Sequence, residues 1–532
     1  MKRSAAEAAL RVSPQGNMTQ RKRGKGFTMK QYLRAILMTV IVLAAMLPAG
    51  SADSFALEES EITVPETIQA EPNPLVEEPL PRTELDVQQP DEASGRRALP
   101  PRYHSKDEGL VTSVKDQENY GICWAMAAIS CAETSVLKKY GKRKIDLSEA
   151  HLAHFIYNRP SDPLGNTQGD RVILDRKEDY LNMGGDDKKT LLALAGWTGA
   201  ARESVLSMKD LTAGGTGRFV PQEKAWQNSY TLKNGFMLPA DSERETIKRM
   251  ILKYGSLNAA LYTDPFYFES EHMEASYCDV PEIANHEVCI VGWDDTYSRD
   301  KFKDGTRPQQ DGAWIVKNSW GTGYHKAGYF YLSYEDKSLC DLIAYEFQPA
   351  DTYDHNYQYD GNIYPSYLAG IENGGKFANV YEVKGESSGR DEILKAVGLV
   401  TYTPGMKYSV QIYKDLKDKS DPESGTPMLE EAAAGTVAFA GFITKELPEE
   451  LVLSQGTRFS IVITVTDAGD NGTIGTETEM DTGGAVYHAE VSPRQSFMKA
   501  PSGEDAKWED LYEYGACLRI KGFTEAAEMV GL

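Results

Sequence analysis

A cysteine at the start of a predicted helix is the feature that most constrains the fold and chemistry of this sequence. The stretch 117–125 reads Gln-Glu-Asn-Tyr-Gly-Ile-Cys-Trp-Ala, which places Cys123 directly after a glycine turn. Four alanines between positions 124 and 133 favour a helix, and Gly141 predicts its end. At a helix N-terminus the macrodipole and the unpaired N–H groups favour the thiolate, which is the nucleophilic form. The sequence therefore predicts an activated thiol.

An activated thiol needs a proton acceptor, and His286 is the candidate among the eight histidines. The apolar, β-branched run after it predicts a buried strand that holds the imidazole rigidly. A second apolar run, 312–317, ends in the sequence Asn318-Ser319-Trp320-Gly321. The amide oxygen of Asn318 can accept the second imidazole N–H, and the neighbouring tryptophan can keep water away from that hydrogen bond.

Four segments, taken in this order, resemble the papain family of cysteine peptidases. They are Gln117 with Cys123-Trp124, the Asp-Leu-Ser-Glu at 146–149, the stretch 285–293 around His286, and 318–321 followed by Gly328-Tyr329-Phe330. Each segment alone carries little weight, whereas all four in this order are highly specific. The resemblance implies an α+β fold with a helical lobe, a β-rich lobe and a cleft between them.

The resemblance also implies a role for each of these residues. Cys123 would be the nucleophile that forms a thioester acyl-enzyme with the carbonyl of a peptide bond. His286 would pair with the thiolate and then protonate the leaving amine, and Asn318 would orient it. The Gln117 side chain and the backbone N–H of Cys123 would form the oxyanion hole.

Three further residues are expected to bind substrate or shield the site. Gly184 and Gly185 match a family segment whose backbone pairs with an extended substrate, and glycine allows that close approach. Trp320 would cover the contact between His286 and the asparagine. The acidic pair Asp186 and Asp187 then follows, where it either favours basic substrate side chains or forms an ordinary solvated loop.

The C-terminal segment, 351–524, has short alternating or β-branched runs instead of helical periodicity, which indicates an antiparallel β-sandwich. In placement and strand pattern it is similar to the lectin-like domain of exported bacterial papain-like peptidases. A sandwich alone does not establish sugar binding. The strand candidates are 376–383, 393–402, 406–413, 435–442, 458–465 and 516–523.

Residues 1–56 are predicted to be a signal peptide. Basic residues precede an apolar stretch at 35–47, which is shorter than the ~20 residues of a membrane span. A retained peptide would instead act as a single anchor. Few cysteines in an exported protein indicate a bacterial source, so we expect a secreted or cell-surface protein.

The remaining domain limits follow from composition. Residues 57–101 are rich in glutamate and proline and predict a linker or pro-segment. The papain-like domain is expected at 102–348, with polar insertions at 158–180, 200–235 and 296–311 that predict surface loops near the cleft.

Net charge and the spacing of the histidines and cysteines limit which binding partners, metal ions and disulfides are expected. Nine of the 57 Lys and Arg residues and two of the 79 Asp and Glu residues precede position 57, which leaves a formal charge of −29 on the remainder. Binding to nucleic acid or to an anionic membrane is therefore not expected. His151 and His154 have helical spacing but no further ligand nearby, so neither a metal nor a cofactor is expected. Five further cysteines are scattered and predict no disulfide framework: Cys131, Cys278, Cys289, Cys340 and Cys517.

The favoured interpretation is an exported endopeptidase whose substrates are proteins or peptides. Its β-sandwich would position it on a target such as surface glycans or cell-wall material. Two rivals are a surface adhesin that keeps the scaffold for binding, and a cysteine hydrolase of cell-wall peptides with another fold. The rivals are weaker, because a binding scaffold needs no complete set of Gln117, Cys123, His286 and Asn318, and another fold does not explain the Asn-Ser-Trp-Gly segment.

Overall fold

The computed structural model describes residues 98–527 except 142, 213–218, 240, 270–272, 385–388, 470 and 503–505. The predicted signal peptide and nearly all of the acidic segment 57–101 lie outside the described residues. Within the described ranges, no helix is long and apolar enough to cross a membrane.

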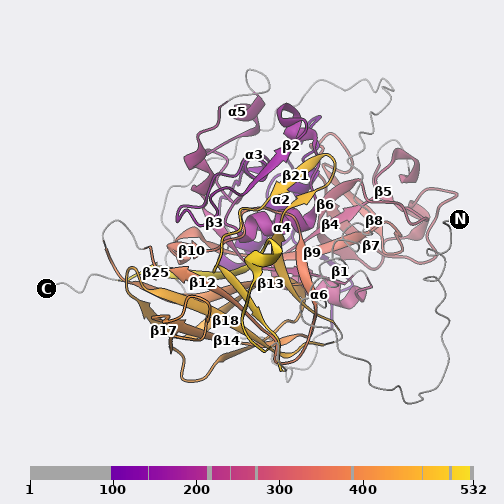
Figure 1. The fold of residues 1–532 in the computed structure, drawn as a ribbon. Helices are drawn as coiled ribbons and strands as arrows, with labels where there is room; N and C mark the ends of the chain where they lie inside the picture. Colours follow the sequence, from indigo (N-terminus) through magenta and orange to yellow (C-terminus); the bar gives the residue numbers. More distant parts are fainter. Residues whose placement is uncertain are drawn as a thin grey trace, which may run out of the picture.

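Helix α2 (Cys123–Tyr140) is the central element of the helical lobe (Figure 1). Every residue from Trp124 to Leu137 is buried, because the helix contacts two helices of its own lobe and strands β6 (His286–Asp294) and β9 (Cys340–Pro349) of the other. It ends at Gly141, whose φ of 83° lets the chain turn away. The other helices of this lobe are α3 (Glu149–Phe155), α4 (Asp187–Ala195), α5 (Met208–Thr212) and the 3₁₀ turns η1 (Lys177–Asn182) and η2 (Gln222–Trp226).

The β-rich lobe is built on an antiparallel run of strands in the order β9-β4-β6-β7-β8. Its core holds the buried rings of Trp293, Trp314 and Phe330, which pack with Ile251 of α6. Since β6 and β7 are antiparallel partners, the start of β6 lies beside the end of β7. The elements are β4 (Leu257–Leu261), β6 (His286–Asp294), β7 (Ala313–Lys317), β8 (Tyr329–Ser333), β9 (Cys340–Pro349), α6 (Arg244–Tyr254), β1 (Arg102–His104), β5 (Ala275–Ser276), η3 (Pro265–Tyr267) and η4 (Arg299–Lys301).

The C-terminal segment is an antiparallel β-sandwich, as predicted. One sheet contains β10 (His355–Tyr357), β25 (Ile520–Ala526), β13 (Glu392–Thr401) and β17 (Ala440–Leu453). The facing sheet contains β15 (Thr426–Pro427), β14 (Lys407–Lys414), β18 (Arg458–Asp467), β12 (Lys376–Glu382), β22 (Ser496–Lys499) and β23 (Glu509–Asp510), with β16 (Ala433–Thr436) at its edge. The remaining elements are β11 (Ser366–Ile371), β19 (Gly472–Thr478), β24 (Ala516–Leu518), β20 (Met480–Asp481), β21 (Ala485–His488), η5 (Ala350–Thr352) and η6 (Leu511–Tyr514).

The predicted strand 516–523 divides between β24, which pairs with β19, and β25, which pairs with β13 in another sheet. The predicted strand 435–442 likewise crosses between sheets. Its first part belongs to β16, which pairs with β14, and its second part begins β17, which pairs with β13. The sequence pattern is the same on both sides of this crossing, so it gave no sign of the break. The predicted α+β class, with a helical lobe, a β-rich lobe and a β-sandwich, is confirmed.

The two parts of the chain share their sheets, which the sequence did not predict. Strand β3 (Tyr230–Met237) pairs with β9 on one edge and with β17 of the sandwich on the other. Strand β2 (Arg171–Leu174) pairs with β21. The prediction that 158–180 and 200–235 are surface loops was therefore wrong, because both insertions supply a strand that joins the two parts.

Buried polar contacts reinforce this junction. The guanidinium group of Arg159 donates to the carbonyl oxygens of Gly196 and Gly361, at 2.9 and 3.0 Å. Asp170 accepts backbone N–H groups of Gly361 and Glu490, at 3.1 and 2.7 Å. These bonds link the insertion 158–180 to the sandwich, so the two parts are in firm contact.

Candidate active site

Cys123 is the first residue of α2 and is partly exposed. Burial raises the pKa of its thiol to about 12, and the nearby charge of Glu287 acts in the same direction. The backbone N–H groups of Glu287, Trp124 and Cys123 itself oppose this shift. The predicted effect of the helix N-terminus is therefore present, but it does not by itself produce a thiolate. The contact with the Glu287 N–H also places the thiol beside the start of β6.

His286 begins β6, and Asn318 follows β7 directly. Because these strands pair, His286 Nε2 lies 2.7 Å from Asn318 Oδ1, and both side chains are buried. An amide oxygen only accepts, so the imidazole donates from Nε2 and its Nδ1 carries the lone pair. Burial lowers the pKa of His286 to about 4.

The two pKa shifts have one chemical consequence. Burial disfavours a lone thiolate and a lone imidazolium alike, whereas transfer of the proton from Cys123 to His286 creates both charges together, and each compensates the other. The helix N-terminus adds to the stability of the thiolate. The predicted pairing of Cys123 with His286 would therefore supply the reactivity that the buried thiol alone lacks.

Gln117 is fixed at both ends of its side-chain amide. Its Nε2 donates to the carbonyl oxygen of Tyr120 at 2.9 Å, and its Oε1 accepts from the hydroxyl of Ser319 at 2.7 Å. The Ser319 backbone N–H also donates to Asn318 Oδ1 at 2.9 Å. One serine thus ties the predicted oxyanion-hole residue to the residue that orients His286.

Trp320 covers the imidazole, with its ring centroid 5.0 Å from that of His286. An indole in this position limits the access of water to the bond between His286 and Asn318.

Glycine occupies positions 184 and 185 for two different structural reasons. A Cβ atom on Gly185 would lie 2.5 Å from the Trp124 ring, next to the cysteine, so only glycine fits there. Gly184 has φ of 71°, and its carbonyl accepts from the Tyr157 hydroxyl at 2.6 Å. Gly185 therefore packs tightly against Trp124, the residue after Cys123, whereas nothing lies within 4 Å of the Cβ position of Gly184.

The acidic pair is divided between two roles. Asp186 caps α4 and forms an ion pair with Lys189 at 2.7 Å, which accounts for its side chain. Asp187 is buried, and one of its carboxylate oxygens has no hydrogen-bond partner within the described structure. Burial, together with the charge of Asp341, holds the pKa of Asp187 well above its ordinary value.

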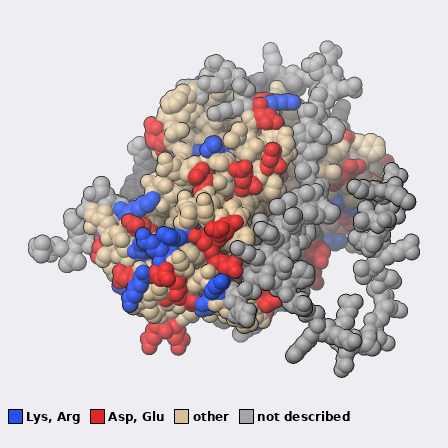
Figure 2. Space-filling view, in the orientation of Figure 1, with Lys and Arg blue, Asp and Glu red and all other residues tan. Residues whose placement is uncertain are grey.

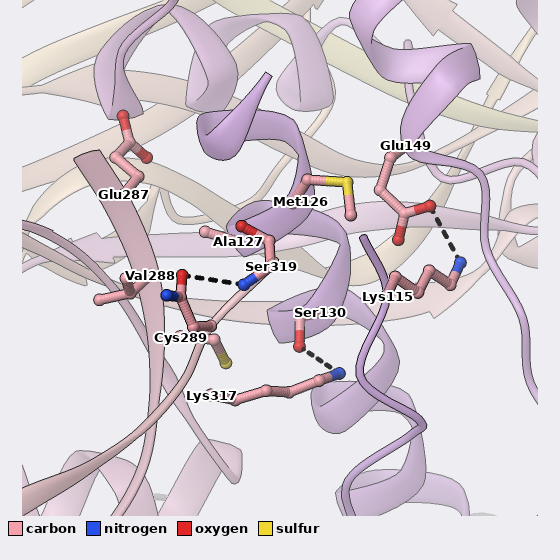
Figure 3. Close-up of a pocket in the computed structure, with 11 residues that line it drawn as sticks. Lys115, Met126, Ala127, Ser130, Glu149, Glu287, Val288, Cys289, Lys317 and Ser319 are labelled. Carbon is pink, nitrogen blue, oxygen red and sulfur yellow. Dashed lines mark hydrogen bonds and ion pairs between the residues drawn. The ribbon is translucent and has the colours of Figure 1, made fainter. Parts of the chain in front are cut away.

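A small polar cavity lies under the site, between α2 and the start of β6 (Figure 3). Lys317 is buried there and donates to the hydroxyls of Ser130 and Thr112, at 2.9 and 3.1 Å. The sulfur atoms of Cys131 and Cys289 lie 3.3 Å apart as thiols. These groups hold α2 against the β-rich lobe, and the cavity is too small for a substrate.

The other histidines of the helical lobe have structural partners. His151 Nε2 lies 2.8 Å from the Lys224 carbonyl oxygen, and His154 Nδ1 lies 2.8 Å from the Tyr180 hydroxyl. In the part of the chain that the structure describes, no group of three or more His, Cys, Asp or Glu side chains could hold a metal ion.

Sequence reasoning missed His325, Ser319 and Glu287. His325 Nε2 lies 2.8 Å from Asn318 Nδ2, on the side of the amide opposite His286. Its position seven residues after Asn318 was a weak signal, because a histidine in a polar turn is ordinarily solvated.

Comparison with known proteins decides the family. Residues 99–156 and 193–350 match the model of the papain family cysteine protease, and residues 356–524 match that of a lectin-like domain. The chain therefore contains a papain-family domain followed by a lectin-like domain. Its papain-like part is similar to a cathepsin L-like protein of Caenorhabditis elegans, at 25% identity over 271 residues, which cover 49% of this chain and 64% of the relative. Procathepsin L of Rattus norvegicus is 25% identical over 250 residues, covering 46% and 64%. The chain thus spans less than two thirds of the length of these relatives.

Two solved structures extend the similarity over both domains. Both are of Cwp84, one described as a clostridial cysteine protease after propeptide cleavage and one as a surface layer associated protein of Clostridium difficile. The first is 26% identical, with a TM-score of 0.65, over 80% of this chain and 99% of that chain. The second, which contains the protease and lectin-like domains, is 26% identical, with a TM-score of 0.66, over 81% and 90%. The predicted combination of a papain-like and a lectin-like domain is confirmed.

Proposed function

We propose that this protein is an exported cysteine endopeptidase that hydrolyses peptide bonds through Cys123, His286, Asn318 and Gln117. The observation that carries the proposal is the 2.7 Å bond from His286 to Asn318, together with a thiol at the N-terminus of α2 that meets the backbone N–H of Glu287, the residue after His286. This geometry is suited to acyl transfer.

The reaction would proceed in two halves. His286 accepts the proton of Cys123, and the thiolate attacks the peptide carbonyl to give a tetrahedral oxyanion, which the Cys123 N–H and the Gln117 amide stabilise. The intermediate collapses when the imidazolium donates its proton to the leaving amine, which leaves a thioester on Cys123. Water, activated by the neutral imidazole, then hydrolyses the thioester and restores the thiol.

The lectin-like domain would hold the enzyme on its target. The similarity to Cwp84, a surface layer associated protein, supports an extracellular bacterial location, and the sequence of residues 1–56 supports export. Because β3 and β17 join the domains, a target bound to the sandwich would be presented to the site at a nearly fixed distance. Surface glycans or cell-wall material are the candidate ligands.

The test uses the protein from Leu57 onward beside its Cys123→Ala variant. Each is incubated with a mixed peptide library and with an epoxide that alkylates papain-type thiols. The proposal predicts cleavage and labelling by the wild type alone, with labelling abolishing cleavage. Cleavage by the alanine variant would contradict it.

A further inference from the structure

His325 lies in the turn between β7 and β8 and has an unusual backbone. Its φ is 54°, in the left-handed region that residues with a side chain seldom adopt. The ring stacks against Trp320 and Phe268, with centroid distances of 5.3 and 5.5 Å. A residue held in a strained conformation between two aromatic rings indicates that the position of its side chain matters.

Both ring nitrogens of His325 have a partner. Nδ1 lies 2.7 Å from the carbonyl oxygen of Met273, and Nε2 lies 2.8 Å from the amide nitrogen of Asn318. A carbonyl oxygen only accepts, so Nδ1 must carry the hydrogen. Neutral His325 therefore has its lone pair on Nε2, where it accepts an N–H of Asn318.

This bond, together with the Ser319 backbone N–H that donates to Oδ1 at 2.9 Å, determines which way the Asn318 amide faces. With its nitrogen bound to His325, the amide presents its oxygen to His286 Nε2 at 2.7 Å. The flipped amide would place an oxygen against the lone pair of His325 and an N–H against the N–H of His286. Both contacts would be repulsive. The series of hydrogen bonds from Met273 through His325 and Asn318 to His286 therefore has only one consistent order of donors and acceptors.

We infer that His325 is a positioning residue, which fixes the Asn318 amide and through it the tautomer and orientation of His286. The inference rests on the proposed peptidase function, because the order that His325 imposes leaves Nδ1 of His286 unprotonated to receive the thiol proton. His325 acts through the asparagine and touches neither substrate nor thiol.

The hydrogen bond between His325 and Asn318 should depend on pH. Burial lowers the pKa of His325, while the Met273 carbonyl and the charge of Glu269 oppose that shift. The other titratable group that faces it is His286. Below its pKa, His325 gains a proton on Nε2 and no longer accepts from the amide. Activity should then fall on the acid side, through the loss of this bond.

Three variants test the inference. His325→Phe keeps a flat ring but removes both nitrogens, whereas His325→Gln keeps an acceptor and a donor in similar directions. Lys326→Ala, at an exposed neighbour in the same turn, is the control. We expect His325→Phe to lower kcat about tenfold with KM within about twofold, and to change the acid limb of the pH profile. His325→Gln should recover most of the activity, and Lys326→Ala should match the wild type.

A double-mutant cycle separates positioning from folding. In an Asn318→Ala background, His325→Phe should cause no further loss in kcat or in the rate of thiol alkylation, because the group through which it acts is gone. Additive losses, equal losses in the Phe and Gln variants, or a Phe variant as active as the wild type would each overturn the inference. A wild type without cleavage would overturn the proposed function, and this inference with it.

Discussion

At the scale of single residues, the site is a connected set of hydrogen bonds. Ser319 donates to Gln117 with its hydroxyl and to Asn318 with its backbone, at 2.7 and 2.9 Å. The two roles proposed for these residues, stabilising an oxyanion by Gln117 and orienting His286 by Asn318, would therefore share one support. Variants of Gln117 and His286 should separate these functions, because peptide hydrolysis forms an oxyanion and alkylation of the thiol does not.

Gln117→Ala should reduce kcat by about 10²–10³, because one donor to the developing oxyanion is lost. The rate at which a haloacetamide alkylates Cys123 should stay close to that of the wild type, since that reaction forms no oxyanion. His286→Ala is the contrasting variant, in which both rates should fall. A Gln117→Ala protein that loses alkylation as well would contradict this separation of roles.

Asp187 should favour substrates with a basic side chain at the second subsite. Its buried carboxyl lies close enough to Glu287 and Asp341 for their charges to act on one another, so a cation there would relieve their repulsion. Peptides with Arg at this position should be cleaved faster than those with Leu, and the ratio should rise with pH as the carboxyls ionise. Kinetics of matched peptides on the wild type and Asp187→Asn provide the check. Equal cleavage of both peptides by the wild type would refute the expectation.

The sequence alone predicts those site residues that lie within a recognisable local pattern. Cys123, His286 and Asn318 each sit in a recognisable run, and the structure brings those runs together at one place. His325 could not be found in this way, because its partner Met273 lies 52 positions earlier and is reached only through folding. The role of Asp186 as a helix cap was also hidden, since acidic residues before a helix suit either a cap or a binding loop.

At the scale of elements, the least predictable feature is the pairing of β3 with β17. Alternation of polar and apolar residues and runs of β-branched residues predict most strands of the sandwich. They do not predict which strands become neighbours in a sheet. At this junction Gly441 has φ of 122°, and a Cβ atom there would lie 2.1 Å from the Gly235 carbonyl oxygen. The two backbones therefore approach more closely than any other residue would allow.

Gly441→Ala should therefore destabilise the protein by more than about 2 kcal/mol, because the new methyl group meets a backbone atom that cannot move aside. Gly484→Ala is the matched control, since a Cβ atom there would meet nothing within 4 Å. Chemical denaturation of both variants gives the comparison. Equal stability of the two variants would show that the β3–β17 contact is looser than described.

At the scale of the whole molecule, two domains with separate sequence patterns form one continuous assembly. Figure 2 shows acidic and basic side chains intermixed over the sandwich. In the same domain, Lys395 pairs with Glu450 and Lys407 with Asp467, so the large negative charge is partly balanced by local ion pairs. The junction itself buries carboxyl groups from both domains.

Stability at this junction should fall as pH rises. Burial raises the pKa of Asp170 to about 6 and holds that of Glu477 well above its ordinary value, partly through the charge of Asp170. The folded protein then binds protons that the unfolded chain releases, so stability is lost from about pH 4 to pH 6 and above. Melting temperatures should decline less for Glu477→Gln than for the wild type, with the exposed Glu450→Gln as control. Parallel curves for all three proteins would refute this assignment.

In the proposed reaction, Cys123 carries the acyl group of the substrate. An acid-quenched reaction with a slowly hydrolysed ester substrate, followed by mass spectrometry of the proteolytic fragments, measures this directly. We expect one acyl group per molecule, on the fragment that contains Cys123, and none after His286→Ala under the same conditions. Turnover without an adduct on Cys123, or with an adduct on another residue, would contradict it.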